Sequence, residues 1–290
     1  MPSLNRQVIG KAYPPFTMEV ESHRSIYFAL ATNDPNPHYT DGSLGSAHIA
    51  PPMFAVVYGG GVMPEILLDE DIGDGFYMHL VHGEQEITWH RLPKPGQTCT
   101  TTSTVTQIED KGSGELLTVR SETLRTKDQA PVCTQVLRFF VRGYGSLEKK
   151  HKDTTPHPNN KPEELLFSVQ ESVLPGQPFI YAEASGDHNP IHTDNEFATQ
   201  MGLDGIILQG LCTMSFCHKA LVQQLCNGNP HPITQCNVRF SKPVRPKDNL
   251  RIEAWWINQD SQQVGFQALN AQNRPVIQNG FAQLGTLAQD

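Results

Sequence analysis

The sequence predicts an α+β protein built from two tandem units, each a central helix followed by antiparallel strands. Segments in which apolar and polar residues alternate fall into two sets of four, one in each half of the 290-residue chain. An apolar run at helical spacing, residues 211–225, precedes the second set. Because a strand with one apolar face buries that face against another element, each set is expected to form a sheet wrapped around its helix.

The predicted strands are bounded by Gly, Pro, Asn or Asp, which is typical of strands separated by turns. They cover residues 85–90, 99–108, 116–124, 132–141, 234–240, 250–257, 264–269 and 276–284. Two such sheets can join edge to edge, which would hide their open edges. The chain would then form a pseudodimer within one polypeptide.

A polar motif occurs once in each half of the chain. Asp34 in the first copy aligns with Asp187 in the second, and Pro95 in a later turn aligns with Pro246. We infer that one ancestral module was duplicated. The segment between the copies is polar, rich in lysine and proline, and without apolar periodicity. We therefore predict an N-terminal domain at 1–143, a linker at 144–164 and a C-terminal domain at 165–290.

Composition restricts the function classes. The formal charge of −8 argues against nucleic acid or an anionic membrane surface as the main partner, since both require a strong positive field. No apolar run is long enough to span a bilayer. The hydrophobic content of 38% is sufficient to form buried hydrophobic cores. The six cysteines show no CxxC pairing, so we expect reduced core residues and no metal site.

Asp187 and His192 form the candidate catalytic pair. Asn189-Pro190 between them forces a bend, so the two side chains flank a turn. A carboxylate that orients a water beside an imidazole able to exchange a proton near neutral pH can add water to a double bond. The alternative is purely structural, because Asp-x-Asn-Pro is also an ordinary Asx turn or helix cap.

Gly210 stands at the mouth of the predicted 211–225 helix. The first N–H groups of a helix lack intrahelical partners, and the positive end of the helix dipole coincides with them. A residue without a side chain would let a substrate carbonyl approach these donors closely. Gly210 is therefore the candidate oxyanion-binding residue.

The stretch that contains Asp187, His192 and Gly210 resembles the signature of the MaoC-like, R-specific enoyl-CoA hydratases (hydratase 2). This family includes the hydratase domain of peroxisomal multifunctional enzyme type 2. The resemblance extends to His82-Gly83-Glu84-Gln85, to residues 110–114 and to residues 238–244. It implies a double hot-dog fold and assigns Asn189 a supporting role beside the catalytic pair. One departure is Gln209, since the family usually has histidine before the glycine at the helix mouth.

A strip of basic residues begins at the end of the first predicted strand of the second half and continues into the following turn. It comprises Arg239, Lys242, Arg245 and Lys247, and is opposed nearby by Asp248. Cations concentrated on an acidic protein suit a phosphate-bearing handle such as coenzyme A, which would be part of the substrate and not a separate cofactor. The alternative interpretation is a solvated strand and turn.

The first copy differs where the chemistry would lie. Tyr39 occupies the position of His192, so only the second half is expected to be catalytic. Three consecutive glycines, Gly59 to Gly61, interrupt the first helix, because each is less favourable there than alanine by about 1 kcal/mol. We expect this domain to accommodate the acyl chain, with Met53 and Phe54 in the pocket. A flexible surface loop is the alternative.

The Asp187–His192 pair favours addition of water to a double bond, and the resemblance implies that the reaction is reversible hydration of a trans-2-enoyl-CoA to a (3R)-3-hydroxyacyl-CoA. Alternatives are dehydration of (3R)-hydroxyacyl carrier-protein thioesters, acyl-CoA hydrolysis by a hot-dog thioesterase, and noncatalytic acyl-CoA binding. A homodimer is compatible with this interpretation. The last three residues, Ala288-Gln289-Asp290, are not a Ser-Lys-Leu-type address, so we expect a freestanding cytoplasmic protein.

Overall fold

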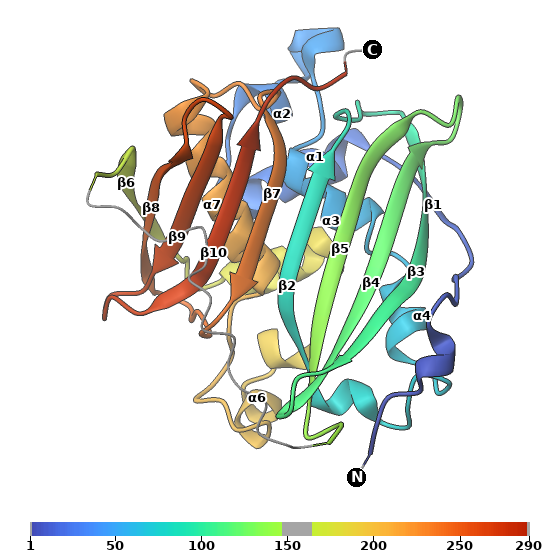
Figure 1. Cartoon of the computed structure of the whole chain (residues 1–290). Helices are drawn as coiled ribbons and strands as arrows, with labels where there is room; N and C mark the ends of the chain where they lie inside the picture. Colours follow the sequence, from blue (N-terminus) through green and yellow to red (C-terminus); the bar gives the residue numbers. More distant parts are fainter. Residues whose placement is uncertain (1, 147–163, 289–290) are drawn as a thin grey trace.

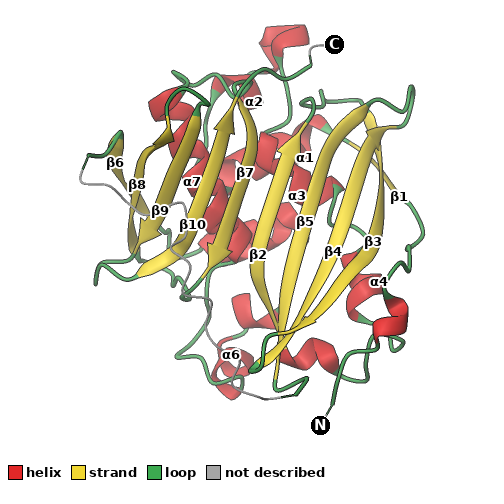
Figure 2. Cartoon of the chain, viewed as in Figure 1, coloured by secondary structure: helices red, strands yellow, loops and turns green. Residues whose placement is uncertain are grey.

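A computed structural model describes residues 2–146 and 164–288. Within them, ten strands form one antiparallel sheet in the order β1-β3-β4-β5-β2-β7-β10-β9-β8-β6 (Figure 1). Helices α1, α3 and α7 lie behind the sheet, on one face of it (Figure 2). The α+β class and the two helix-wrapped sheets joined in one chain are confirmed.

The N-terminal half supplies one end of this sheet. Its strands are β1 (Phe16–Glu19), β2 (Leu80–Trp89), β3 (Thr98–Asp110), β4 (Gly114–Arg125) and β5 (Pro131–Arg142). Its α-helices are α1 (Ser22–Ala31), α2 (Pro37–Thr40), α3 (Ala55–Tyr58) and α4 (Met63–Leu67), with 3₁₀ turns η1 (Arg6–Val8), η2 (Gly42–Ala47), η3 (Pro52–Phe54) and η4 (Phe76–His79).

The C-terminal half repeats this plan with one long helix. Its strands are β6 (Phe167–Ser172), β7 (Ile233–Phe240), β8 (Asn249–Asn258), β9 (Gln263–Leu269) and β10 (Pro275–Leu284). Its helices are α5 (Gln177–Ser185), the 3₁₀ turn η5 (Pro190–His192), α6 (Asn195–Gln200) and α7 (Gly210–Leu225). The eight predicted strands and the 211–225 helix are therefore present. The short edge strands β1 and β6 were missed.

The two halves meet where β2 pairs antiparallel with β7, from Glu84 opposite Arg239 to Thr88 opposite Gln235. This pairing satisfies one edge of each half with backbone hydrogen bonds, as the edge-to-edge prediction requires. Glu84 also lies 3.9 Å from Arg239 across the seam and 3.6 Å from Arg138 on β5. The seam is therefore lined by opposite charges on its solvent side.

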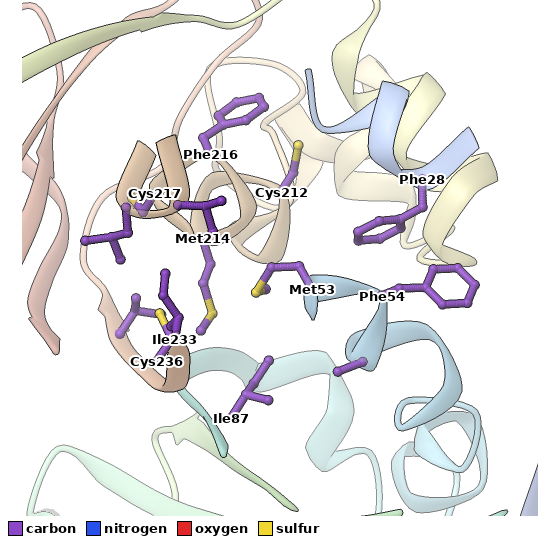
Figure 3. Close-up of a cluster of buried hydrophobic side chains, with 14 of the residues drawn as sticks. Phe28, Met53, Phe54, Ile87, Cys212, Met214, Phe216, Cys217, Ile233 and Cys236 are labelled. Carbon is purple, nitrogen blue, oxygen red and sulfur yellow. The ribbon is translucent and has the colours of Figure 1, made fainter. Parts of the chain in front are cut away.

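One hydrophobic core extends under both halves. Figure 3 shows Met53 of η3 beside Met214 of α7, and Phe54 of η3 near Phe28 of α1. Phe28 packs edge-on against Phe54 at 5.5 Å between ring centroids, and at 5.7 Å from Tyr181 of α5. Because these rings come from both halves, this core is completed only when the halves pack together, whereas a second, smaller cluster around Ile66 and Leu117 lies within the N-terminal half.

The glycine run behaves only partly as expected. Helix α3 ends at Tyr58, directly before Gly59, so the first helix is interrupted. The space left by the missing side chains is filled, however. A Cβ on Gly59 would lie 1.8 Å from Nε2 of Gln135, and one on Gly61 would lie 2.3 Å from the ring of Phe16. These glycines make room for neighbouring side chains and do not themselves open a space for an acyl chain.

Three other expectations concern segments outside the site. Most of the predicted linker, 144–164, lies outside the described residues, although Tyr144 is buried and its hydroxyl donates to the carbonyl of Asp74 at 3.1 Å. All six cysteines are free. In the described ranges 2–146 and 164–288, no helix has both the length and the apolar character to cross a membrane.

The filled space beside Gly59 gives a first prediction. Gly59→Ala should lower the free energy of unfolding by about 2 kcal/mol, because the new methyl would meet Gln135 and the carbonyl of Ala55 at 2.7 Å. Denaturant titration would measure this. Gly42→Ala is the control, since nothing lies within 4 Å of a Cβ there. Equal stability of both variants would contradict the packing described.

Candidate active site

The second copy of the motif folds as a tight turn after α5. Gly186 ends the helix in the left-handed region, with φ +81°, which a residue without Cβ adopts readily. The Asn189 side chain then caps η5 by accepting from the Ile191 N–H at 3.3 Å. The Asn189 N–H donates to Oδ1 of Asp187 at 3.3 Å. Asn189 thus shapes the loop that carries Asp187 and His192.

The structure brings Asp187 and His192 together. Oδ2 of Asp187 lies 3.7 Å from Nε2 of His192. Nδ1 of His192 is 2.9 Å from the carbonyl of Ile207, which can only accept, so Nδ1 carries a proton. In the neutral imidazole, Nε2 therefore presents its lone pair toward Asp187. The Asp187 side chain is 40% exposed and that of His192 only 9%, so the pair is at the edge of a buried region, open on the carboxylate side.

Gly210 is the first residue of α7, and Gln209 before it has extended backbone angles. The unpaired donors of the first helical turn therefore begin at Gly210. A Cβ at this position would lie 3.0 Å from the ring of Phe240. Packing against Phe240 thus also favours glycine at this position, a reason that the sequence did not reveal.

His82 is a further candidate site residue. It belongs to a segment that carries the family resemblance, but the sequence alone indicated no role for it. The register of β2 shifts between His82 and Glu84, and such a bulge turns the side chain to the inner face. Its ring lies 4.9 Å from that of Phe139 and 5.2 Å from that of Phe240. The signal in the sequence was Gly83, because a glycine inside a strand often marks a bulge.

The electrostatics of His82 connect it to the catalytic pair. Burial lowers the pKa of His82 to about 4, although the carboxylate of Asp187 opposes this shift. The imidazole is therefore neutral near pH 7. Its Nε2 is buried and has no hydrogen-bond partner among the described residues. A buried, unpaired nitrogen beside Phe240 is available to a bound molecule.

The basic strip begins next to the site and continues away from it. Phe240, which touches Gly210, directly follows Arg239 at the end of β7. Arg239, Lys242, Arg245 and Lys247 are all exposed. Arg239 is 3.9 Å from Glu84, and Arg245 is 2.6 Å from Asp204. The position suits a handle that leaves the site toward solvent, and the role of each cation stays a prediction.

The first copy of the motif has the same shape but is closed. Asn36 caps α2 as Asn189 caps η5, and Tyr39 is fully buried in the place of His192. Asp34 is 6% exposed. Lys219 of α7 pairs with Glu171 of β6 beside it and donates to the carbonyl of Asn33 at 3.1 Å. Side chains of the second half thus fill the first site.

Met53 and Phe54 lie in the shared core, with exposed fractions of 3% and 0%. They are on the side of α7 that faces the N-terminal half (Figure 3). Their predicted contact with an acyl chain stays a prediction.

Two similar halves form one continuous sheet wrapped around helices, which defines a double hot-dog fold. Within the described residues, the Asp187–His192 pair is open to solvent, whereas its counterpart in the first copy is buried. Residues 157–275 match the family model of the MaoC-like domain, and residues 7–135 match that of the FAS1-like dehydratase domain region. The chain thus contains a MaoC-like domain in its C-terminal half and a FAS1-like dehydratase domain region in its N-terminal half.

Named relatives and a solved structure agree with this assignment. The probable enoyl-CoA hydratase 2 of Dictyostelium discoideum is 29% identical over 71% of this chain and 71% of that protein. Peroxisomal multifunctional enzyme type 2 of Mus musculus is 28% identical over 95% of this chain, which spans 38% of the mouse protein. A MaoC-like dehydratase from Phytophthora capsici has the same fold, with a TM-score of 0.83, 23% identity and 96% of each chain covered.

The closed first copy gives a prediction on stability. Burial raises the pKa of Asp34 to about 6, although Lys219 nearby favours its ionised form. The folded protein therefore binds a proton more tightly than the unfolded chain, and stability falls as the pH rises from about 4 through 6. Asp34→Asn removes this effect. At pH 8 the variant should be more stable than the wild type by up to about 3 kcal/mol.

Chemical denaturation at pH 4 and pH 8 measures this difference. It should be much smaller at pH 4, where the carboxyl is protonated in the folded protein and about half protonated in the unfolded chain. A variant that is less stable than the wild type at pH 8 would mean that the Asp34 carboxylate stabilises the cluster.

Proposed function

We propose that the chain catalyses the reversible hydration of trans-2-enoyl-CoA to (3R)-3-hydroxyacyl-CoA. The observation that carries this proposal is the Asp187–His192 pair, 3.7 Å apart, with Nδ1 of His192 fixed by the carbonyl of Ile207. That arrangement leaves one carboxylate and one imidazole nitrogen facing a common space. The name of the Dictyostelium discoideum relative, a probable enoyl-CoA hydratase 2, and the match to the MaoC-like domain support the same reaction class, so the chain is a hydro-lyase.

The proposed reaction begins with polarisation of the thioester. Its carbonyl oxygen accepts the N–H of Gly210, where the dipole of the sixteen-residue helix α7 adds positive potential. This draws electron density from the conjugated double bond and makes carbon 3 electrophilic. A water held between Asp187 and His192 attacks carbon 3, losing a proton to the pair. The pair returns a proton to carbon 2, and the reverse sequence removes water.

The two halves contribute different parts of the substrate site. The pair and Gly210 come from the second half, whereas the neutral imidazole of His82 faces them from the first. The CoA phosphates lie along Arg239, Lys242, Arg245 and Lys247, and the acyl chain extends toward Met53 and Phe54. The two halves have these different roles because the first copy of the motif is closed. Each chain therefore has one proposed site.

A dehydratase of carrier-protein thioesters is the second candidate, because the same pair catalyses the reverse reaction on either handle. The exposed basic strip suits the phosphates of CoA and equally an acidic carrier surface. Comparing a CoA thioester with the matching carrier-protein thioester separates the two. Thioester hydrolysis instead would release a free thiol and support the thioesterase alternative.

The catalytic pair gives the most direct mutational prediction. Asp187→Asn and His192→Ala should each lower kcat by at least about a hundredfold, the usual scale of a positioned acid or base. Hydration of crotonyl-CoA, followed by the loss of conjugated absorbance, measures this. Asp34→Asn is the matched control in the closed copy and should keep wild-type kcat. Wild-type turnover in a folded Asp187→Asn or His192→Ala protein would remove the pair from the mechanism.

The basic strip predicts a change in KM. Lys242→Ala and Lys247→Ala should raise KM several-fold with kcat little changed, because a phosphate contact is equally strong in the ground state and the transition state. The increase should diminish at high salt. Lys127→Ala, which removes an exposed lysine at the β4–β5 turn, is the control. If KM stays unchanged in all strip variants, Arg239 and Arg245 included, the phosphates bind elsewhere.

A further inference from the structure

The backbone segment 207–210 contacts His192 and includes Gly210, two parts of the proposed catalytic apparatus. The carbonyl of Ile207 accepts from Nδ1 of His192 at 2.9 Å. The Leu208 N–H donates to the carbonyl of Val244 at 2.7 Å, which ties the segment to the β7–β8 connection. Gly210 supplies the first N–H of α7. A shift of this segment would therefore move the imidazole and the oxyanion donor together.

The side chain of Gln209 extends this framework to Asp187. It is 1% exposed, and its Nε2 donates to the carbonyl of Pro178 at 3.1 Å. The same nitrogen makes a longer donation, 3.4 Å, to the carbonyl of Asp187. Pro178 is near the start of α5, and Asp187 follows its end. One amide nitrogen thus holds both the helix and the loop that emerges from it.

The chemistry of the amide is suited to this task. A primary amide nitrogen carries two N–H donors and stays neutral at every working pH, so it can serve two carbonyls without adding charge beside Asp187. Its Oε1 is buried with no partner among the described residues. Burying an unpaired oxygen is unfavourable, because the group loses its hydrogen bonds to water. An apolar side chain would avoid that cost, which indicates that the two N–H donations are what the site requires.

We propose that Gln209 is a positioning residue that fixes Asp187 relative to His192 and to the Gly210 N–H. The inference rests on the proposed hydration at this pair. Gln209 does not touch the substrate, and acts by keeping the carboxylate at the distance at which it shares a water with the imidazole. Displacements of about 1 Å in such a site lower the rate by up to about a hundredfold.

Gln209→Met tests the proposal, because it keeps the length of the side chain and removes both donors. We expect kcat to fall about tenfold to a hundredfold with KM within about twofold, since the substrate contacts are intact. Gln135→Met is the matched control. Gln135 is also buried and donates to the carbonyl of Ala55 at 2.9 Å, so its loss should lower stability and leave kcat within about twofold. Wild-type kcat in folded Gln209→Met would overturn the proposal.

Gln209→Glu provides a measurement that should not change with pH if the role of Gln209 were only structural. The introduced carboxyl donates a hydrogen bond only when protonated, whereas the amide does not titrate. The ratio of the variant's kcat to that of the wild type should therefore rise as the pH is lowered, because the titration of the shared catalytic groups cancels in the ratio. A ratio that is independent of pH would contradict the positioning role.

Hydrogen–deuterium exchange separates this inference from the proposed function. In Gln209→Met, the amides of residues 187–192 should exchange faster than in the wild type, and in Gln135→Met they should not. This measurement needs no substrate. If wild-type protein hydrates no enoyl thioester and the exchange still increases, the proposed function fails while Gln209 still holds the loop. Unchanged exchange would mean that Gln209 does not hold it.

Discussion

Backbone pairing between β2 and β7 is the interaction on which the rest of this structure depends. It joins two five-stranded halves into one sheet and hides an edge of each. It also fixes which residues of the first half reach the site of the second, because His82 lies on β2 just beyond the paired region. The shared core behind the sheet, with Phe28 between Phe54 and Tyr181, forms only when the halves are in this register.

The two copies of the duplicated motif have the same local shape and different surroundings. Asn36 and Asn189 cap equivalent turns, so the Asx-Pro sequence determines the backbone in both. Asp34 is enclosed by Lys219 and Glu171, whereas Asp187 is partly exposed beside His192. The local sequence therefore sets the turn, and contacts with the other half decide whether the carboxylate is available for chemistry.

Much of the fold could be predicted from the sequence, because eight strands and α7 have strong periodicity and clear turn residues. Strands β1 and β6 were missed because they have only four and six residues, and so short an alternating segment does not distinguish a strand from a loop. The turn carrying Asp187 and His192 was predictable from Asn189-Pro190. The contacts of Gln209 and the inward position of His82 were not, because both depend on neighbours distant in sequence. The Gln135 side chain occupies the space beside Gly59. This contact could not be predicted either, because the two residues are distant in sequence.

The stereochemistry of hydration tests the central claim most directly. Water is expected to attack from the side of the enoyl group that faces Asp187 and His192, while the thioester is held by the N-terminus of α7. Wild-type protein incubated with a trans-2-enoyl-CoA should form the (3R)-3-hydroxyacyl-CoA, identified by chiral analysis of the product. Formation of the (3S) product, or no hydration of either a short or a long substrate, would contradict the account.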